Sequence, residues 1–177
     1  LQVSPNQIYS SIYNGTNNNN ASFQISPSQL SQNFNDSVNN ANGSFNINSS
    51  QISSNINDNA NNKSASLQIT PSQIFEYFND SPNSRQGQFT INNSQVYASF
   101  YDGSASNNGY LFITPTQAYQ YFTNGSNQNG SMAVMPTQIY SQFNDGTTGA
   151  NGNLAVYTTE FAASFQNGNG NNGHIYA

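Results

Sequence analysis

Apolar and polar positions recur in short blocks along the whole chain of 177 residues. Each block opens with an apolar, any, apolar triplet such as Phe23-Gln24-Ile25, whose period of two places both apolar side chains on one side of a strand of about three residues. The triplets begin at Leu1, Phe23, Phe45, Leu67, Phe89, Leu111, Met132 and Leu154. Successive starts are 21 or 22 residues apart. The chain is therefore a tandem array of eight imperfect copies of one unit.

A second apolar pattern follows each triplet and predicts a helix. Ser26-Pro27-Ser28-Gln29 offers a hydroxyl N-cap, a proline at the first helical position and a glutamine at the capping-box position. Two apolar residues four positions apart come next, as at Leu30 and Phe34, with a polar residue midway. This spacing also fits one face of a strand, but the capping signature favours a helix of about ten residues. Asp36-Ser37, like other Asn or Asp pairs with a small residue, is expected to end it.

One such strand and helix cannot bury an apolar side alone, so neighbouring units must stack on one another. The sequence predicts a single α/β repeat solenoid over residues 1–177, with short parallel strands in one layer, short helices in the other, and a ninth strand begun at Ile175. Strands lie about 4.8 Å apart and helices roughly 8–10 Å apart, so the array should curve. A series of aromatic residues should form its core: Phe34, Phe78, Phe100, Phe122 and Phe143.

The repeat unit resembles those of two known kinds of repeat protein in part. Leucine-rich repeats are similar in their strand-and-helix units, although their leucine and asparagine consensus is absent here. Curli-type amyloid subunits resemble the chain in repeat length and in their Gln, Asn, Ser and Gly content, but their Gln-x-Gly and Asn-x-Ala spacing is missing. The proline beside most of the expected strands also opposes cross-β stacking. The alternative fold that remains is an all-β solenoid.

The composition favours a protein that is secreted or displayed at the cell surface. Only 5% of the residues are charged, whereas globular domains have about 25%. The net charge is −5 and the only basic residues are Lys63 and Arg85, so neither nucleic acid nor an anionic membrane is an expected partner. No apolar stretch approaches the roughly 20 residues of a membrane helix, so membrane insertion is not expected. The absence of cysteine excludes disulfides.

No set of catalytic residues is recognisable, so we expect no enzyme, no catalytic residue and no cofactor. The one histidine, His174, is an ordinary tail residue by position. Carboxylates share one repeat position and form a weak candidate stripe for calcium, since this ion prefers oxygen ligands. The stripe consists of Asp36, Asp58, Asp80, Asp102 and Asp145. One carboxylate per unit is sparse, and turn formation explains these residues better, so no metal is expected.

The leading functional hypothesis is an extracellular structural repeat protein that binds copies of itself end to end, as a filament or a surface or matrix layer. Exposed strand edges invite pairing with another molecule, and the expected edges are marked by Leu1, Val3, Ile175 and Ala177. Mid-strand polar residues should form a surface ladder opposite the core. The ladder consists of Gln2, Gln24, Asn46, Gln68 and Thr90.

The alternative function is an adhesin-type module that recognises a cell-surface or matrix glycan, because solenoid faces commonly serve as binding surfaces. Exposed aromatic rings would make the contacts with sugar. The candidates are Tyr9, Tyr97, Tyr119 and Tyr140. Ice binding by a regular polar face is less favoured, because the ladder changes from Gln2 to Ala155 along the array.

Overall fold

The computed structural model describes residues 1–177 and is all-β. Its regular elements are seventeen strands and one short 3₁₀ helix, η1 (Ser81–Asn83). Contacts divide the chain into two compact units, unit 1 (Leu1–Asn93) and unit 2 (Ser94–Ala177). The expected α/β solenoid with a helical layer is therefore wrong, and the all-β alternative fits.

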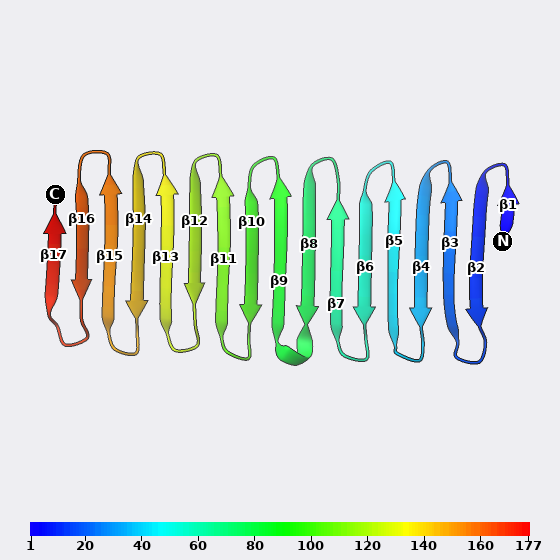
Figure 1. Ribbon diagram of the computed structural model, residues 1–177, viewed down its shortest axis with the longest axis horizontal. Helices are drawn as coiled ribbons and strands as arrows, with labels where there is room; N and C mark the ends of the chain where they lie inside the picture. Colours follow the sequence, from blue (N-terminus) through cyan, green and yellow to red (C-terminus); the bar gives the residue numbers. More distant parts are fainter. The chain divides into compact units, whose positions relative to one another are not determined.

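Each unit is an antiparallel meander, in which consecutive strands of the chain lie side by side (Figure 1). The strands of unit 1 are β1 (Gln2–Ser4), β2 (Gln7–Asn14), β3 (Asn19–Ser26), β4 (Gln29–Asp36), β5 (Ala41–Asn48), β6 (Ile52–Asp58), β7 (Lys63–Ile69), β8 (Gln73–Asp80) and β9 (Arg85–Asn92). The strands of unit 2 are β10 (Val96–Asp102), β11 (Asn107–Thr114), β12 (Gln117–Thr123), β13 (Gln128–Met135), β14 (Gln138–Asp145), β15 (Ala150–Tyr157), β16 (Phe161–Gln166) and β17 (Asn172–Tyr176).

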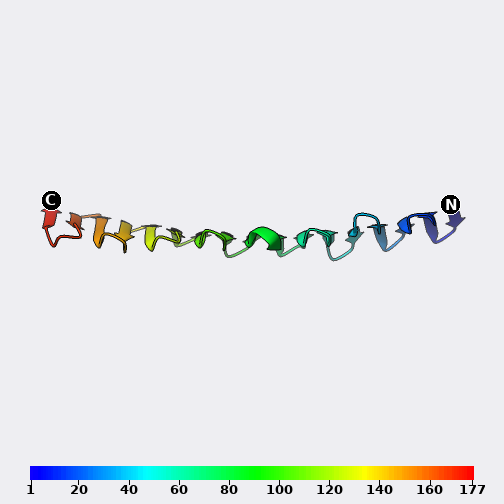
Figure 2. The same ribbon diagram turned by 90° about the horizontal axis from the view of Figure 1, so that it is seen from below.

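Each repeat is one β-hairpin. In the copy that contains β3 and β4, a two-residue turn, Pro27-Ser28, joins the strands, and a four-residue turn, Ser37–Asn40, leads to the next hairpin. The predicted triplet Phe23-Gln24-Ile25 lies in the second half of β3, so the real strand is longer than expected. Figure 2 shows the strands edge-on, and within each unit they form a single layer with no helices above or below.

The residues expected to cap a helix instead close the two-residue turn. The Oγ1 atom of Thr70 accepts hydrogen bonds from the backbone N–H groups of Ser72 (3.3 Å) and Gln73 (3.1 Å). In the third repeat, which lacks the proline, the Oδ1 atom of Asn48 accepts hydrogen bonds from the backbone N–H groups of Ser50 (2.9 Å) and Gln51 (3.0 Å). A helix N-cap accepts the same kind of bond, so the local signature does not distinguish a helix start from a hairpin turn.

The apolar residues four positions apart lie on one face of a strand. Leu30 and Phe34 of β4 lie opposite Ile47 and Gly43 of β5, and Gln32 between them lies opposite Phe45. The midway polar residue that favoured a helix therefore shares the apolar side of the strand. It is tolerated there because this side is not buried.

A left-handed residue ends the four-residue turn of most repeats. These residues are Asn18, Asn40, Asn62, Ser84, Ser106, Asn127 and Gly149, with Gly170 in the last turn, and their φ angles lie between 49° and 83°. Asn and Gly tolerate this backbone conformation better than other residues. The Asn or Asp and small-residue pairs therefore mark chain reversals, as expected, but they do not end helices.

Neither unit has a conventional core. Ala133 (8% exposed) and Ala155 (6%) are the only buried hydrophobic side chains, and no large side chain is fully buried. The phenylalanine series expected in the core is 41–56% exposed. That expectation was wrong because it assumed a second layer, and a single-layer sheet leaves both sides of every strand in contact with solvent.

Candidate functional site

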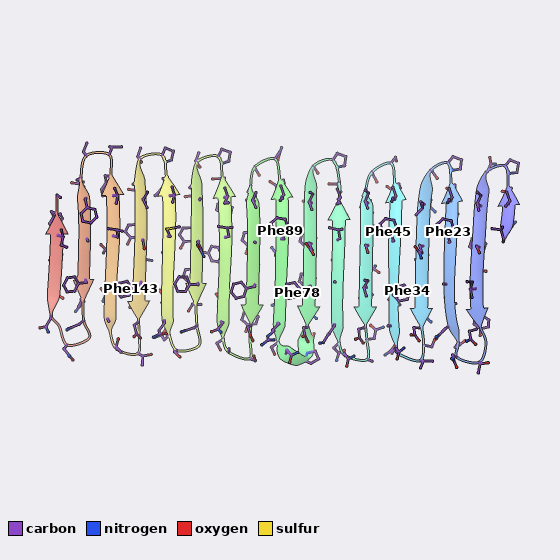
Figure 3. The ribbon with its side chains drawn as sticks, viewed as in Figure 1. Phe23, Phe34, Phe45, Phe78, Phe89 and Phe143 are labelled. Atoms are coloured by element: carbon purple, nitrogen blue, oxygen red, sulfur yellow. The ribbon has the colours of Figure 1, made fainter.

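One side of the sheet in each unit, which we call the apolar face, carries the repeated large apolar residues. Side chains directly opposite one another on neighbouring strands share a face, so the register groups them into rows. The middle row contains Phe23, Phe45, Leu67, Phe89, Leu111, Met132, Leu154 and Ile175. The row nearer the four-residue turns contains Ile12, Phe34, Ile56, Phe78, Phe100, Phe122, Phe143 and Phe165. Figure 3 shows Phe34 and Phe78 of this second row.

Glycine lies directly opposite each phenylalanine of the second row. In unit 2, Phe100 pairs with Gly109 and Phe122 pairs with Gly130. A Cβ atom added to Gly109 would lie 2.9 Å from Cε1 of Phe100, so the ring occupies the space above the glycine. This arrangement shields a strand backbone that a glycine alone would leave open.

A hollow lies on the apolar face of unit 2 between two of these rings. Its volume is about 470 Å³, and its lining includes Phe100, Gly109, Leu111 and Phe122 from β10, β11 and β12. The hollow is large enough for an apolar side chain of another molecule, because ligand pockets begin at about 300 Å³.

Every Asp, Glu, Lys and Arg within a strand lies on the apolar face. Most lie in one row beside the four-residue turns, where Lys63 of β7 forms an ion pair with Asp80 of β8 (3.3 Å). Glu76 alone lies in the middle row, opposite Leu67 and Phe89. The charges therefore line one margin of the apolar face and leave most of its interior neutral.

The candidate calcium stripe belongs to this margin, and each carboxylate bonds to its own turn. Asp36 accepts hydrogen bonds from the backbone N–H groups of Val38 (3.1 Å) and Asn39 (3.2 Å) and from the Asn39 side chain (2.7 Å). These bonds, led by the Asn39 side chain, lower the pKa of Asp36. Asp58, Asp80, Asp102 and Asp145 also bond to residues of their turns. The structure contains no group of three or more His, Cys, Asp or Glu side chains that could hold a metal.

The opposite side of the sheet, which we call the amide face, carries Asn, Gln, Ser, Thr and Tyr. The predicted ladder lies on this face, with residues of the intervening strands between its members: Gln24 of β3 lies opposite Ser31, and Ser31 lies opposite Asn46. Some neighbours are hydrogen-bonded, as where Nδ2 of Asn57 donates to Oδ1 of Asn42 (2.9 Å). Gln2, Gln68 and Thr90 occupy the same row.

The corresponding row of unit 2 contains more aromatic residues than that of unit 1, which has Tyr9 and Phe75. The register brings Tyr97, Phe112 and Tyr119 side by side on β10, β11 and β12, and Tyr140 follows on β14 beyond Ala133. Three of the four tyrosines expected to contact glycans therefore share one row. Tyr9 lies in unit 1, between Gln2 and Gln24.

Two further tyrosines complete a cluster that the sequence did not reveal. The ring of Tyr110 lies 6.4 Å from Tyr97, 5.6 Å from Tyr119 and 5.4 Å from Tyr121 between centroids. Burial and the hydroxyl of Tyr119 raise the pKa of Tyr110. The alternation Tyr119-Gln120-Tyr121 was the available signal, but it identifies a shared face only once the segment is known to be a strand.

The remaining predicted residues lie at the ends of the described chain. Val3 lies on β1 and Ile175 on β17, both on the apolar face, and Leu1 is 90% exposed. Ala177 exchanges two backbone hydrogen bonds with Phe161 (2.8 and 3.1 Å). His174 lies on the amide face, opposite Ser164.

No protein-family model matches the chain, and no curated protein matches it either. None of its helical segments has the length and hydropathy required to span a membrane. The two faces of the sheet are therefore the features of the chain that bear on its function.

Proposed function

We propose that the protein is a non-enzymatic structural repeat protein that self-associates by packing its apolar face against the apolar face of a second copy. The observation that carries this proposal is a repeated row of large apolar side chains with nothing covering it. A sheet with one apolar face needs a second layer to exclude water, and stable domains have two or more layers. In this proposal the second copy supplies that layer.

The exposed surface supports an interface of substantial size. The chain exposes 11291 Å². A compact monomer of 19.2 kDa exposes roughly 8,400 Å², which leaves an excess of about 2,900 Å². Two copies together carry an excess of about 5,800 Å². Obligate interfaces bury about 2,000–5,000 Å² or more, counted over both partners, so the excess is large enough for a permanent association.

A second copy fits this face better than an unrelated partner because it repeats with the same period. Within a unit, rings such as Phe100 and Phe122 alternate with glycines such as Gly109, and the hollow between these two rings is apolar. A facing copy with the same spacing can place a side chain in this hollow and others between the repeated rings, since two sheets pack about 10 Å apart with interdigitated side chains. The marginal row of charges can remain in solvent.

This mode of association suits an extracellular filament, layer or matrix, as the composition suggests. The amide face stays exposed, and its neutral polar groups keep the assembly hydrated. Pairing between strand edges marked by Leu1, Val3, Ile175 and Ala177 remains a separate prediction. Face packing and edge pairing could extend an assembly in different directions.

Two neighbouring residues of β14 provide a direct test. Ser141 lies on the apolar face between Met132 and Leu154, and Gln142 lies on the amide face between Ser131 and Asn153. The chain has no cysteine, so Ser141→Cys and Gln142→Cys each carry a single thiol. Ser141 is half-buried and Gln142 is exposed in the single chain, so each position is compared with its own labelling rate in the monomer. In assembled protein, identified by sedimentation velocity, maleimide should label position 141 on the order of tenfold more slowly than in the monomer, whereas the rate at position 142 should be unchanged.

Assembly that leaves the labelling rate at position 141 unchanged, or a monomer at every concentration, would overturn face packing. Edge pairing alone would leave both positions at their monomer rates, so the experiment distinguishes the two modes. Circular dichroism confirms that each variant folds. If either variant fails to fold, Ala163→Cys and Ser164→Cys on β16 form a second pair on opposite faces.

A further inference from the structure

The tyrosine row, which we define as Tyr97, Phe112, Tyr119, Ala133, Tyr140 and Ala155, forms a regular aromatic surface on the amide face of unit 2. Its three tyrosines lie on alternate strands, β10, β12 and β14. Neighbouring strands are about 4.8 Å apart, so successive tyrosines lie about 9.6 Å apart across the sheet. We infer that this row binds a neutral, extended β-1,4-linked glycan.

The row has raised and low positions. Ala133 lies between Tyr119 and Tyr140, and Ala155 lies on the far side of Tyr140. These alanines are the most buried hydrophobic side chains of the protein. Tyr119 and Tyr140 therefore rise above Ala133, and Tyr140 rises above Ala155. The row therefore has two aromatic platforms along a line that crosses the strands: one formed by Tyr97, Phe112 and Tyr119, and one formed by Tyr140 beyond Ala133.

Neighbouring rings hold part of the row in place before any ligand binds. Tyr110 contacts both Tyr97 and Tyr119, with ring planes tilted by 30° and 35°. In addition, Tyr140 Oη donates a hydrogen bond to Oε1 of Gln142 (3.0 Å). Side chains that are already ordered lose less entropy on binding, which favours affinity.

Hydrogen-bonding groups lie beside the aromatic row. Ser131, Gln142 and Asn153 form the adjacent row across β13, β14 and β15. Ser131 is only 6% exposed, so the amide groups of Gln142 and Asn153 are the ones that a ligand can reach. These amides can both donate and accept hydrogen bonds, which matches the hydroxyl groups of a sugar. Aromatic platforms beside such a row provide the two kinds of contact that a pyranose ring offers, its C–H face and its hydroxyl edge.

The charge of the amide face and the spacing of the tyrosines restrict the class of ligand further. No Asp, Glu, Lys or Arg of a strand lies on the amide face, so a charged polymer finds no opposite charge there. A β-1,4-linked pyranose chain is extended, and its disaccharide repeat is close in length to the interval between successive tyrosines. An α-1,4-linked chain coils and does not place flat faces at that interval.

This site is independent of the proposed function, because it lies on the face opposite the self-association surface. Isothermal titration calorimetry with cellohexaose and with N-acetylchitohexaose tests it, and maltohexaose is the α-linked control. We expect binding of one or both β-linked hexamers and none of maltohexaose. Binding of cellohexaose alone, of the acetylated hexamer alone or of both supports the inference and identifies the sugar.

Variants then locate the site. Tyr119→Ala and Tyr140→Ala should each weaken binding on the order of tenfold, as expected for loss of one stacking platform. Tyr140→Phe keeps the ring and should retain most of the affinity. Tyr101→Ala is the matched control, because Tyr101 is an exposed tyrosine of the same face that lies outside the row.

Three results would overturn the inference: no binding of either β-linked hexamer, equally tight binding of maltohexaose, or equal losses for Tyr101→Ala and Tyr140→Ala. Circular dichroism identifies any alanine variant that does not fold. Tyr140→Leu, which keeps much of the side-chain volume but removes the aromatic ring, then replaces it and should also weaken binding on the order of tenfold, whereas unchanged binding would overturn the inference. Sedimentation of the same variants shows whether self-association is intact, so failure of one proposal is distinguishable from failure of the other.

Discussion

Phe100 lies directly opposite Gly109, and its ring fills the space that a side chain at position 109 would require. The same relationship recurs along the chain with one systematic change. Where the second-row residue is phenylalanine, the residue opposite it on the following strand is glycine. Where the second-row residue is isoleucine, as at Ile12 and Ile56, the opposite residue is alanine. The two positions are therefore coupled by volume.

Replacing Gly109 with alanine should destabilise the protein by about 1–3 kcal/mol, because the added methyl group displaces the Phe100 ring. This change in the free energy of unfolding is opposite to the usual one, since replacing glycine with alanine in a strand ordinarily stabilises a protein by about 0.5–1 kcal/mol. Urea unfolding at one fixed protein concentration measures the effect, because self-association would otherwise shift the midpoint.

The double variant Phe100→Ile with Gly109→Ala is the matched control, since it reproduces the natural pair Ile56 and Ala65. It should recover most of the loss. A double variant that is no more stable than Gly109→Ala would contradict the coupling.

The two-residue turn should depend on its acceptor atom rather than on the hydroxyl group as such. Thr70→Val removes the acceptor for the N–H groups of Ser72 and Gln73 and should cost about 0.5–1.5 kcal/mol. Thr70→Asn should be nearly neutral, because Asn48 fills this role in the third repeat. Thermal unfolding of both variants tests this, and equal losses would argue against it.

Acid should destabilise the protein through the turn carboxylates. Hydrogen bonds from the Asn39, Asn83 and Thr148 side chains lower the pKa values of Asp36, Asp80 and Asp145, respectively, below 3.8. A lowered pKa in the folded state means that the stabilisation is complete above the unfolded pKa. It is lost as the pH falls through the folded pKa. The urea concentration at the unfolding midpoint should therefore decrease once the pH is below about 4.

Replacing the three aspartates with asparagine should flatten this pH dependence while the turns are kept. Asparagine suits the position, because Asn124 Oδ1 accepts turn hydrogen bonds from Ser126 (3.0 Å) and Gln128 (3.1 Å). The measurement is the urea midpoint from pH 6 to pH 2, a range set by the ordinary aspartate pKa of about 3.9. An unchanged slope in the triple variant would show that other groups control acid unfolding.

The sequence was sufficient to predict the repeat length, the strand at each triplet and the chain reversals at the Asn and Asp pairs. It was not sufficient to distinguish a helix from a second strand between them. Residues Leu30 and Phe34 fit both, and the hydroxyl group of Thr70 forms the bonds of either a helix start or a hairpin turn. The fold class depends on whether the segment after each triplet is a helix or a strand.

The aromatic cluster could not be predicted for a related reason. Tyr97, Tyr110 and Tyr121 come from three strands, and only the hairpin register places them together. With a helix after each triplet, Tyr97 and Tyr110 would lie in different layers. The spacing of Tyr119 and Tyr140 was visible in the sequence, but the low position of Ala133 between them required the pairing of β12, β13 and β14.

The four-residue turn has a consequence for how this chain can change in length. From Phe122 to Phe143 the repeat is one residue shorter than elsewhere, yet Phe143 lies on the same face as Phe122 because the change falls near Asn124, where the chain reverses. A deletion within a strand would turn every later side chain of that strand to the other face. Insertions and deletions of single residues are therefore tolerable only at the reversals, which allows a gene to gain or lose codons there without exchanging the two faces.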